Sequence, residues 1–242
     1  MGEIAITVED LHISYRCVNA ISLKKTLFQK KDDRSRYFEA VKGISFELEK
    51  GKILGVIGKN GSGKSTMLRA LAGIFSPDQG NIDLHGHSIS LLAIGVGFNK
   101  ELSGRENIVL SGLLLGFTEH EVLEHMDAII KFADLGEFID RPVRTYSSGM
   151  YSKLAFSITA NLQTDIILID EVLSVGDSKF KKKSFKKMKE LISDKDRTVI
   201  IVSHSVTSLK ELCDNVLWIH EGKIMMLGGT EETLEKYEEF MA

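Results

Sequence analysis

Residues 58–66 read Gly58-Lys59-Asn60-Gly61-Ser62-Gly63-Lys64-Ser65-Thr66, and they indicate which kind of core this 242-residue chain forms. They follow the apolar run Ile53–Ile57 and precede a helical pattern from Met67 to Ile74. This is GxxxxGK[ST] in the strand, loop and helix setting that binds phosphate. The glycines let successive N–H groups turn inward, so these groups and the positive end of the helix hold the β- and γ-phosphates of a nucleotide. The alternative is a glycine-rich turn that only caps a helix.

Within this phosphate loop (residues 58–66), two side chains have expected roles. We expect Lys64 to place a cation at the phosphates and the Ser65 hydroxyl to ligate Mg²⁺. A second acidic site follows the apolar run Ile166–Ile169, which ends in Asp170-Glu171. In phosphoryl-transfer sites an acid at the end of a strand organises Mg²⁺, and a neighbouring carboxylate polarises the attacking water. We therefore assign Asp170 to the metal and Glu171 to the base, with a simple helix N-cap as the alternative.

Apolar and helical patterns alternate along the chain. Thr118 and Glu121 form a capping box ahead of one helix, and other helical patterns follow Lys64 and begin near Gly149. Strands alternating with helices predict an α/β core with a mainly parallel sheet. We expect one domain, with residues 1–99 and 163–242 as its core and 100–162 as a helical lobe. Short apolar runs predict buried strands at Ile4–Val8, Ile44–Leu48, Ile53–Ile57, Ile166–Ile169, Val199–Val202, Val216–Ile219 and Lys223–Leu227.

Charge and hydropathy exclude two classes of protein. The chain has 31 basic and 34 acidic residues, a formal net charge of -3, so it lacks the basic surplus of a protein that holds nucleic acid. The longest stretch without Asp, Glu, Lys or Arg, Leu84 to Asn99, contains histidines and glycines and is shorter than the roughly 20 apolar residues of a membrane span. We expect no crossing of a bilayer, so any transport would be powered on behalf of another polypeptide.

Two charged segments stand apart from these patterns. Residues 24–36 are a polar, basic excursion that we expect on the surface. Lys179 to Lys189 holds seven lysines and no acid, while Phe185, Met188 and Ile192 keep helical spacing. This pattern favours a helix with a solvated basic face. A contact with lipid headgroups or an anionic partner is the alternative.

A third motif indicates which protein family the chain resembles. Tyr146-Ser147-Ser148-Gly149-Met150 stands ahead of a helical pattern and some twenty residues before Asp170, and it resembles the signature motif of ABC ATPases, usually written LSGGQ. The resemblance implies a P-loop NTPase core with an N-terminal antiparallel β part. It also implies a head-to-tail homodimer with two ATP molecules between the subunits. Ser147, Ser148 and Gly149 would then face the nucleotide bound by the other copy.

Two further segments resemble the same family. Ser174-Val175-Gly176-Asp177 is similar to the D-loop, which links the two sites across the dimer, so Asp177 joins the nucleotide-binding set. His204, two residues after the run Val199–Val202, resembles the switch histidine that reaches the γ-phosphate, although a lone histidine after a strand is usually structural. Tyr15 is the candidate for stacking on adenine, with Phe38 as the alternative.

One branch of the family is most similar to this chain, the exporters of cell-surface polysaccharides, and teichoic acid exporter ATPases above all. O-antigen exporters share most of these features but often add a C-terminal domain for which this chain has no room, so teichoic acid is favoured over O-antigen and capsule. The resemblance implies ATP and Mg²⁺, a membrane-spanning permease in a 2+2 complex, and a place on the cytoplasmic face of the membrane. The motifs that carry it are Phe38-Glu39-Ala40-Val41, residues 91–98, Leu102-Ser103-Gly104-Arg105-Glu106-Asn107 and the segments at 146–150 and 174–177.

The chain also departs from the family pattern. Between Ser90 and Asn107 it has no glutamine, where most members keep one that contacts Mg²⁺ and water, and Gly95-Val96-Gly97 takes that place. Ser148 and Met150 replace the usual Gly and Gln of the signature. Two rival readings follow: an ABC ATPase of DNA repair, which would carry long coiled-coil insertions, and a nucleotide-gated binding module with little turnover. The intact phosphate loop, acids and histidine argue against the second.

Overall fold

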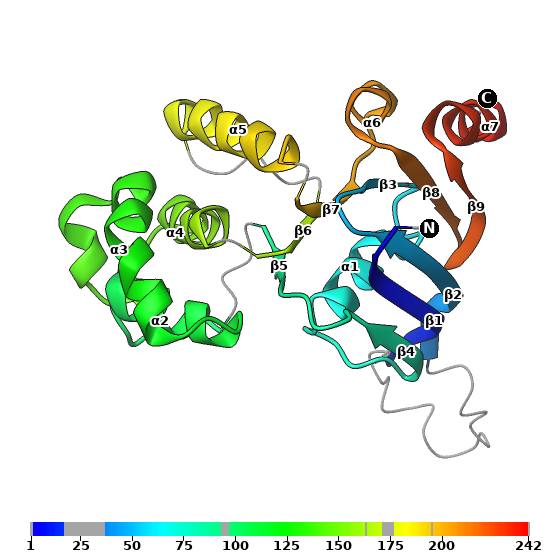
Figure 1. Ribbon diagram of the computed structural model, residues 1–242. Coiled ribbons are helices and arrows are strands. Elements are labelled where there is room, and N and C mark those ends of the chain that lie inside the picture. Colours follow the sequence, from blue (N-terminus) through cyan, green and yellow to red (C-terminus); the bar gives the residue numbers. More distant parts are fainter. Residues whose placement is uncertain are drawn as a thin grey trace, which may run out of the picture.

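The structure, a computed structural model, describes residues 2–16, 37–92, 97–162, 164–170, 177–194 and 196–241. Within them the strands form two sheets (Figure 1). One has three strands in the order β2-β1-β4, and the other has six in the order β5-β6-β7-β3-β8-β9. The strands are β1 Ile4–Arg16, β2 Tyr37–Glu49, β3 Ile53–Ile57, β4 Gln79–Asp83, β5 Ile89–Leu91, β6 Ile166–Ile169, β7 Thr198–Val202, β8 Asn215–His220 and β9 Lys223–Gly229.

The larger sheet is parallel apart from its last strand. β3 pairs in parallel with β7 and β8, and β6 with β5 and β7, while β9 runs antiparallel to β8. Every residue of β6 and β7 is buried, which is why both read as uninterrupted apolar runs. The prediction of an α/β core with a mainly parallel sheet is confirmed.

The smaller sheet is the antiparallel part. β1 pairs antiparallel with both β2 and β4, and it continues to Arg16, well beyond the predicted run Ile4–Val8. The expected N-terminal antiparallel β part is thus confirmed. The sequence patterns missed β4, whose five residues are mostly exposed and polar, and β5, which is only three residues long. The excursion at 24–36 lies outside the described residues.

Helices cover both faces of the larger sheet. Met67, Leu68 and Leu71 of one helix share a hydrophobic cluster with Val202 and the antiparallel sheet, whereas Ile201 belongs to a second cluster with the helices drawn above the sheet in Figure 1. Alternate residues of β7 therefore point to opposite layers, as expected for a strand buried on both faces. The helices are α1 Lys64–Leu71, α2 Gly104–Leu114, α3 Glu119–Ala133, α4 Ser148–Asn161, α5 Ser178–Ile192, α6 Val206–Leu212 and α7 Thr230–Met241.

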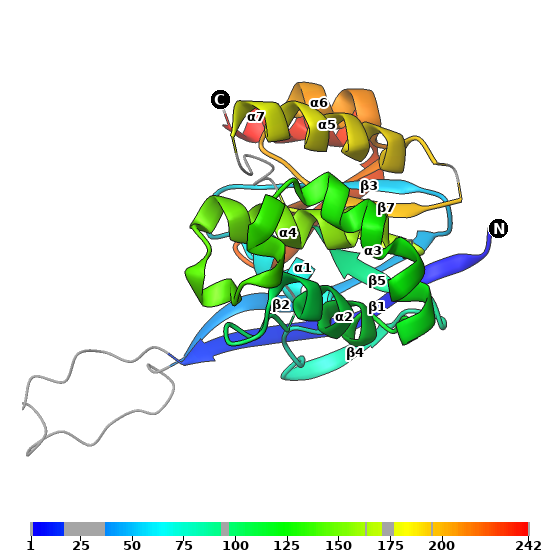
Figure 2. The same cartoon turned by 90° about the vertical axis from the view of Figure 1, so that its left-hand side faces the viewer.

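α2, α3 and α4 pack on one another around a third hydrophobic cluster that includes Ile108, Ile129 and Leu154. Figure 2, which turns this side toward the viewer, shows the three helices in front of the sheets. The Thr118 capping box at the start of α3 is confirmed, and Ser103 forms a second one with Glu106 at the start of α2. Two capped starts explain why these helices begin where they do.

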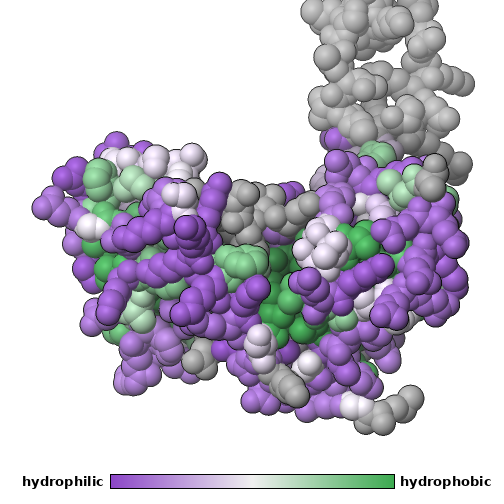
Figure 3. Space-filling view, turned by 90° about the horizontal axis from the view of Figure 1, so that it is seen from above, coloured by the Kyte–Doolittle hydropathy of each residue, from purple (hydrophilic) through white to green (hydrophobic). Residues whose placement is uncertain are grey.

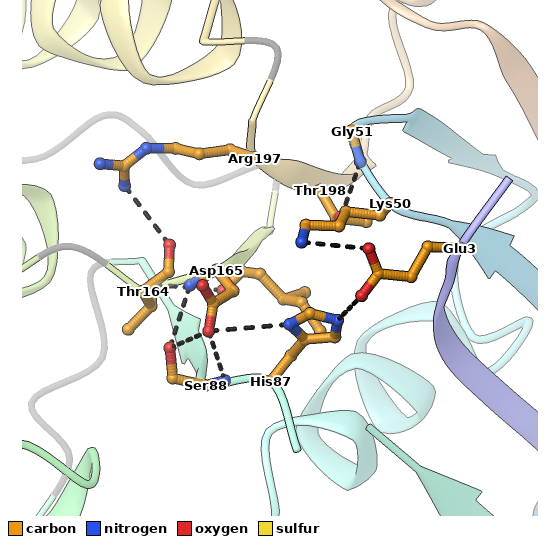
Figure 4. A network of polar contacts seen from close by, with 10 residues as sticks. Glu3, Lys50, Gly51, His87, Ser88, Thr164, Asp165, Arg197 and Thr198 are labelled. Atoms are coloured by element: carbon orange, nitrogen blue, oxygen red, sulfur yellow. Dashed lines mark hydrogen bonds and ion pairs between the residues drawn. The ribbon is translucent and has the colours of Figure 1, made fainter. Parts of the chain in front are cut away.

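A polar network closes the end of the large sheet where β6 and β7 begin (Figure 4). Asp165 Oδ2 accepts hydrogen bonds from the backbone N–H and the hydroxyl of Ser88, at 2.9 and 2.8 Å. His87 lies between this carboxylate, 3.9 Å away, and Glu3 of the segment before β1, 3.8 Å away. Partial burial opposes ionisation, but the Ser88 bonds and nearby cations keep the pKa of Asp165 below its ordinary value. The network links the antiparallel part to the parallel core.

α5 carries the lysine-rich segment, as predicted. Phe180, Met188 and Ile192 are buried on its inner side, and the surface over α5 in Figure 3, which looks down on this layer, is mainly hydrophilic. Phe185 shares the helical spacing of Met188 and Ile192 but not their burial, since its side chain is 52% exposed. It lies on the lysine side of the helix, with Lys189 over its ring. Among the described residues, no helix is both long and apolar enough to span a membrane.

Candidate nucleotide site

A cleft of about 400 Å³ opens where β3, β6 and β7 end. The carboxyl ends of parallel strands meet at one edge of a sheet, which is where ligands bind in such folds. Residues from five separate segments come together there. They are Tyr15, Phe38, Ala40, Asn60, Gly61, Ser62, Gly63, Lys64, Ser65, Thr66, Arg69, Asp170, Val202 and His204.

The phosphate loop has a backbone that only glycine allows at one point. Gly63, the N-cap of α1, has φ of 104°, and a Cβ on it would lie 2.3 Å from the carbonyl oxygen of Ala40. Gly61 also has a positive φ, 78°, but faces open space. No other residue fits at Gly63, because both the backbone angle and the contact with β2 exclude a side chain.

Gly58 and Lys59 do not line the cleft, although they belong to the predicted binding set. They form its support instead. A Cβ on Gly58 would lie 2.1 Å from the carbonyl oxygen of Ile219 in β8, so the loop begins in close contact with that strand.

Lys64 is 5% exposed, and its position is fixed by the loop itself. Its Nζ donates hydrogen bonds to the carbonyl oxygens of Gly58, at 2.7 Å, and Lys59, at 2.9 Å. A buried ammonium held by backbone carbonyls is ready to meet an anion without a large rearrangement. This arrangement suits the predicted role at the phosphates.

The oxygen groups expected at Mg²⁺ lie in the same cleft. The Ser65 hydroxyl is at the first turn of α1, and Asp170 directly follows β6. Hydroxyl and carboxylate oxygens are the hard ligands that Mg²⁺ prefers, so these two residues fit the ion. Glu171, the expected base, lies outside the described residues. His204, two residues beyond the end of β7, lines the cleft as predicted.

Both candidate adenine-stacking rings lie at the cleft. Tyr15 and Phe38 are cross-strand partners in β1 and β2. The Tyr15 hydroxyl is 3.1 Å from the hydroxyl of Thr66, and its ring meets Phe75 edge-on at 6.0 Å. Phe38 is the more exposed of the two, 52% against 37%. Tyr15 is thus tied to the phosphate loop, while Phe38 presents more of its ring.

The residues of the signature segment lie at the start of α4 and not in the cleft. Ser147 is the N-cap of α4, where its hydroxyl accepts a hydrogen bond from Met150 N. Neither Ser147, Ser148 nor Gly149 lines the cleft of its own chain. Tyr146, just before them, donates from its hydroxyl to the carbonyl oxygen of Phe138, at 2.7 Å. The start of α4 therefore does not contribute to the cleft of its own chain.

Asp177 is likewise absent from the cleft. It is the N-cap of α5, where Oδ1 accepts from Phe180 N at 2.9 Å, and its Oδ2 pairs with Lys153 of α4 at 2.5 Å. The hydrogen bond from Lys153, followed by that from Phe180, lowers the pKa of Asp177 to about 2. Ser174, Val175 and Gly176 lie outside the described residues.

Arg69, Ala40 and Val202 line the cleft but were missed by the sequence patterns. Arg69 follows Thr66 by three positions on α1, so both point to the same side of the helix. This spacing was a usable signal. Ala40 and Val202 carry no chemical group that sequence reasoning could have singled out.

The comparisons with known proteins agree with one another. The family model described as ABC transporter matches residues 41–174. An O-antigen export system ATP-binding protein of Klebsiella pneumoniae is 44% identical over 209 residues, which cover 86% of this chain and 85% of that protein. A teichoic acids export ATP-binding protein of Bacillus anthracis is 43% identical over 219 residues, 90% of this chain and 39% of that protein.

Some relatives are much longer. An O-antigen export system ATP-binding protein of Myxococcus xanthus is 45% identical over 200 residues, which cover 83% of this chain but 46% of that protein. This chain thus spans less than half the length of the Myxococcus and Bacillus relatives. Among solved structures, a dimeric ATP-binding cassette bound to ADP and phosphate has a TM-score of 0.67 at 18% identity, over 93% of this chain and 98% of that one. That likeness shows a common fold.

Proposed function

The chain belongs to the ABC transporter family, and we propose that it is the ATP-hydrolysing subunit of an exporter of lipid-linked cell-surface polysaccharide. The observation that carries this proposal is the cleft, which brings Lys64 and Ser65 of the phosphate loop together with Asp170 and His204. These are the groups that phosphoryl transfer to water needs around a bound nucleotide.

In the proposed reaction, the loop N–H groups and Lys64 bind the β- and γ-phosphates. Glu171 accepts the proton of the attacking water, and His204 orients the γ-phosphate. Ser65 and Asp170 would hold Mg²⁺, which, when bound, neutralises charge on the phosphate oxygens. Adenine would lie against the aromatic pair at the mouth of the cleft, with Tyr15 as the first candidate and Phe38 as the alternative.

The proposed active unit is a homodimer. The signature residues at the start of α4 do not reach the cleft of their own chain, and helix N-termini attract anions. We infer that Ser147, Ser148 and Gly149 complete the site of the second copy, and that Asp177 lies at the junction of the two sites. A membrane-spanning permease would join two such subunits in a 2+2 complex on the cytoplasmic face of the membrane.

The proposed cargo is wall teichoic acid, with O-antigen or capsular polysaccharide as alternatives. The Bacillus relative named for teichoic acid export and the Klebsiella relative named for O-antigen export are almost equally similar to this chain, at 43% and 44% identity. The expectation that an O-antigen ATPase would have a further C-terminal domain does not support teichoic acid here, because the chain covers 85% of the Klebsiella O-antigen relative and only 39% of the Bacillus teichoic acid relative. The choice therefore rests on the motif resemblance alone.

The test is ATP hydrolysis by the purified chain, alone and with the permease co-purified from native membranes. We expect turnover that rises in the complex, and a loss of about 100-fold or more in Lys64→Ala, since this removes a preorganised charge at the transferred group. Hydrolysis by Lys64→Ala at the wild-type rate would remove the assignment of the site. Tight ATP binding without turnover in either form would favour the nucleotide-gated binding module instead.

A further inference from the structure

The last turn of α7 lies beside the phosphate loop. The ring centroid of Phe240 is 5.5 Å from the Nζ of Lys59. The same ring is 5.1 Å from that of Trp218 and 5.0 Å from that of His220, both in β8. A phenyl ring from the C-terminal helix is therefore held between two rings of β8 and one lysine of the loop.

β8 is also the strand against which the loop begins. Trp218 pairs with Ile57, the residue directly before Gly58, and Gly58 is in close contact with the carbonyl of Ile219. Trp218 is 7% exposed, and its ring meets Tyr237 of α7 edge-on at 5.7 Å. α7 thus packs on Trp218, the residue of β8 that pairs with the last residue before the loop.

Lys59 connects this aromatic cluster to the centre of the site. Its carbonyl oxygen accepts from Lys64 Nζ, at 2.9 Å, and from Ser62 N, at 3.2 Å. Its ammonium lies at the ring of Phe240, outside the cleft. A cation over an aromatic face is attracted by the ring quadrupole. The side chain of Lys59 is therefore restrained by α7 while its backbone holds the lysine that meets the phosphates.

We propose that Phe240 is a positioning residue for nucleotide binding, acting through Lys59 on the conformation of the phosphate loop. The inference rests on the proposed function of that loop. With the loop already ordered, less conformational freedom is lost when the phosphates bind. Removal of the ring face should weaken binding by about two- to fivefold, the change that corresponds to ~0.5–1 kcal/mol for an exposed cation–π contact.

The experiment is calorimetric titration of the full chain with Mg-ADP, which avoids turnover. Phe240→Leu keeps apolar packing on Trp218 but removes the ring, and Lys59→Met keeps the stem but removes the charge. We expect each to raise Kd two- to fivefold, the double variant to match the single ones, and Phe240→Tyr to bind like the wild type. A shared interaction gives this non-additivity.

The matched control is Phe185→Leu on α5. This ring is similarly exposed, 52% against 46%, and also faces a lysine, Lys189 at 4.9 Å, but it belongs to a helix that packs against α4. It should leave Kd unchanged. In ATP turnover, Phe240→Leu should raise KM with kcat unchanged, since it removes binding common to ground and transition states.

The outcomes are distinguishable. If the wild-type chain does not bind Mg-ADP, the proposed function of the loop is wrong. If the wild type binds and Phe240→Leu binds equally well, or if the effects of the two substitutions multiply in the double variant, the role of Phe240 is wrong. Lys59→Met lies outside α7, so it provides the same test even if Phe240→Leu loosens that helix.

Discussion

Lys153 and Asp177 join α4, the helix that begins at the signature segment, directly to α5. The Nζ of Lys153 and the Oδ2 of Asp177 are 2.5 Å apart. The side chain of Lys153 is 17% exposed, and its Nζ also lies 5.5 Å from the ring centroid of Phe180. Asp177 in turn caps α5 through Phe180 N. The segment resembling the signature and the end of the segment resembling the D-loop are therefore held as one unit within a single chain.

We predict that Asp177 titrates at about pH 2, below its ordinary value of 3.8, because the folded chain stabilises its charged form. The pair then contributes stability above pH 3.8 that is lost as the pH falls toward 2. Carboxyl NMR of the folded protein measures this midpoint. Lys153→Met should move it toward 3.8, whereas Lys179→Met, which removes a lysine paired with Asp134, should not. A wild-type midpoint near 3.8 would contradict the pairing.

Gly63→Ala should abolish nucleotide binding, because the new Cβ would overlap the carbonyl oxygen of Ala40 at 2.3 Å. Gly61→Ala is the matched control, since Gly61 also has a positive φ but faces open space. Gly61→Ala should lose only about 1–2 kcal/mol of folding stability, because alanine is strained in a left-handed backbone conformation. Thermal unfolding and Mg-ADP titration of both variants test this difference. Equal effects would mean that the contact with β2 does not shape the loop.

Tyr15→Ala should weaken ATP binding by about tenfold, in line with the ~1–3 kcal/mol of base stacking on an aromatic side chain. Tyr15→Phe should bind nearly as well as the wild type, since it loses only the contact with the Thr66 hydroxyl. Phe38→Ala should have the smaller effect of the two alanine variants. A larger effect of Phe38→Ala in the same titration would transfer the stacking role to Phe38.

The parts predictable from the sequence were those with a strong local signal. Buried runs such as Ile166–Ile169, and the Thr118 capping box, were found because a single physical rule accounts for each. β4 was missed because its pairing with β1 depends on a distant strand and not on its own pattern. The outward position of Phe185 was missed because spacing alone does not show which side of a lysine-rich helix meets the core.

In the site, too, some features could be predicted from the sequence and others could not. The phosphate loop, Asp170 and His204 follow strand ends, so the topology of a parallel sheet brings them together. The contact of Lys59 with Phe240 joins residues that are far apart in the chain, and no sequence pattern links them. The role of the glycines at 95 and 97 stays a prediction from the sequence, and the structure describes the surroundings of Gly97 alone.

Gly97→Ala should reduce the stimulation of turnover by the permease more than it reduces ATP binding. Gly97 has φ of 69°, and a Cβ there would lie 1.9 Å from Leu114 Cδ1 at the end of α2. If this segment takes the place of the missing glutamine, its backbone freedom lets the helices move when the partner docks. The alternative is that the glycine only permits close approach to Leu114.

Gly86→Ala is the control for that prediction, because Gly86 has φ of 80° in open space. The ratio of turnover with and without the permease should be unchanged in this variant. Equal turnover by the free wild-type chain and the full complex in lipid would contradict the proposed stimulation.

We expect ATP to be bound between two copies of this chain, since the signature residues do not reach the cleft of their own copy. Glu171→Gln keeps the shape of the side chain but cannot accept the proton of water, so ATP should bind and persist. The direct measurement is the mass of this variant by size-exclusion chromatography with light scattering, with and without Mg-ATP. We expect a monomer without nucleotide and a dimer with Mg-ATP. A monomer under both conditions would show that ATP does not bring two copies together.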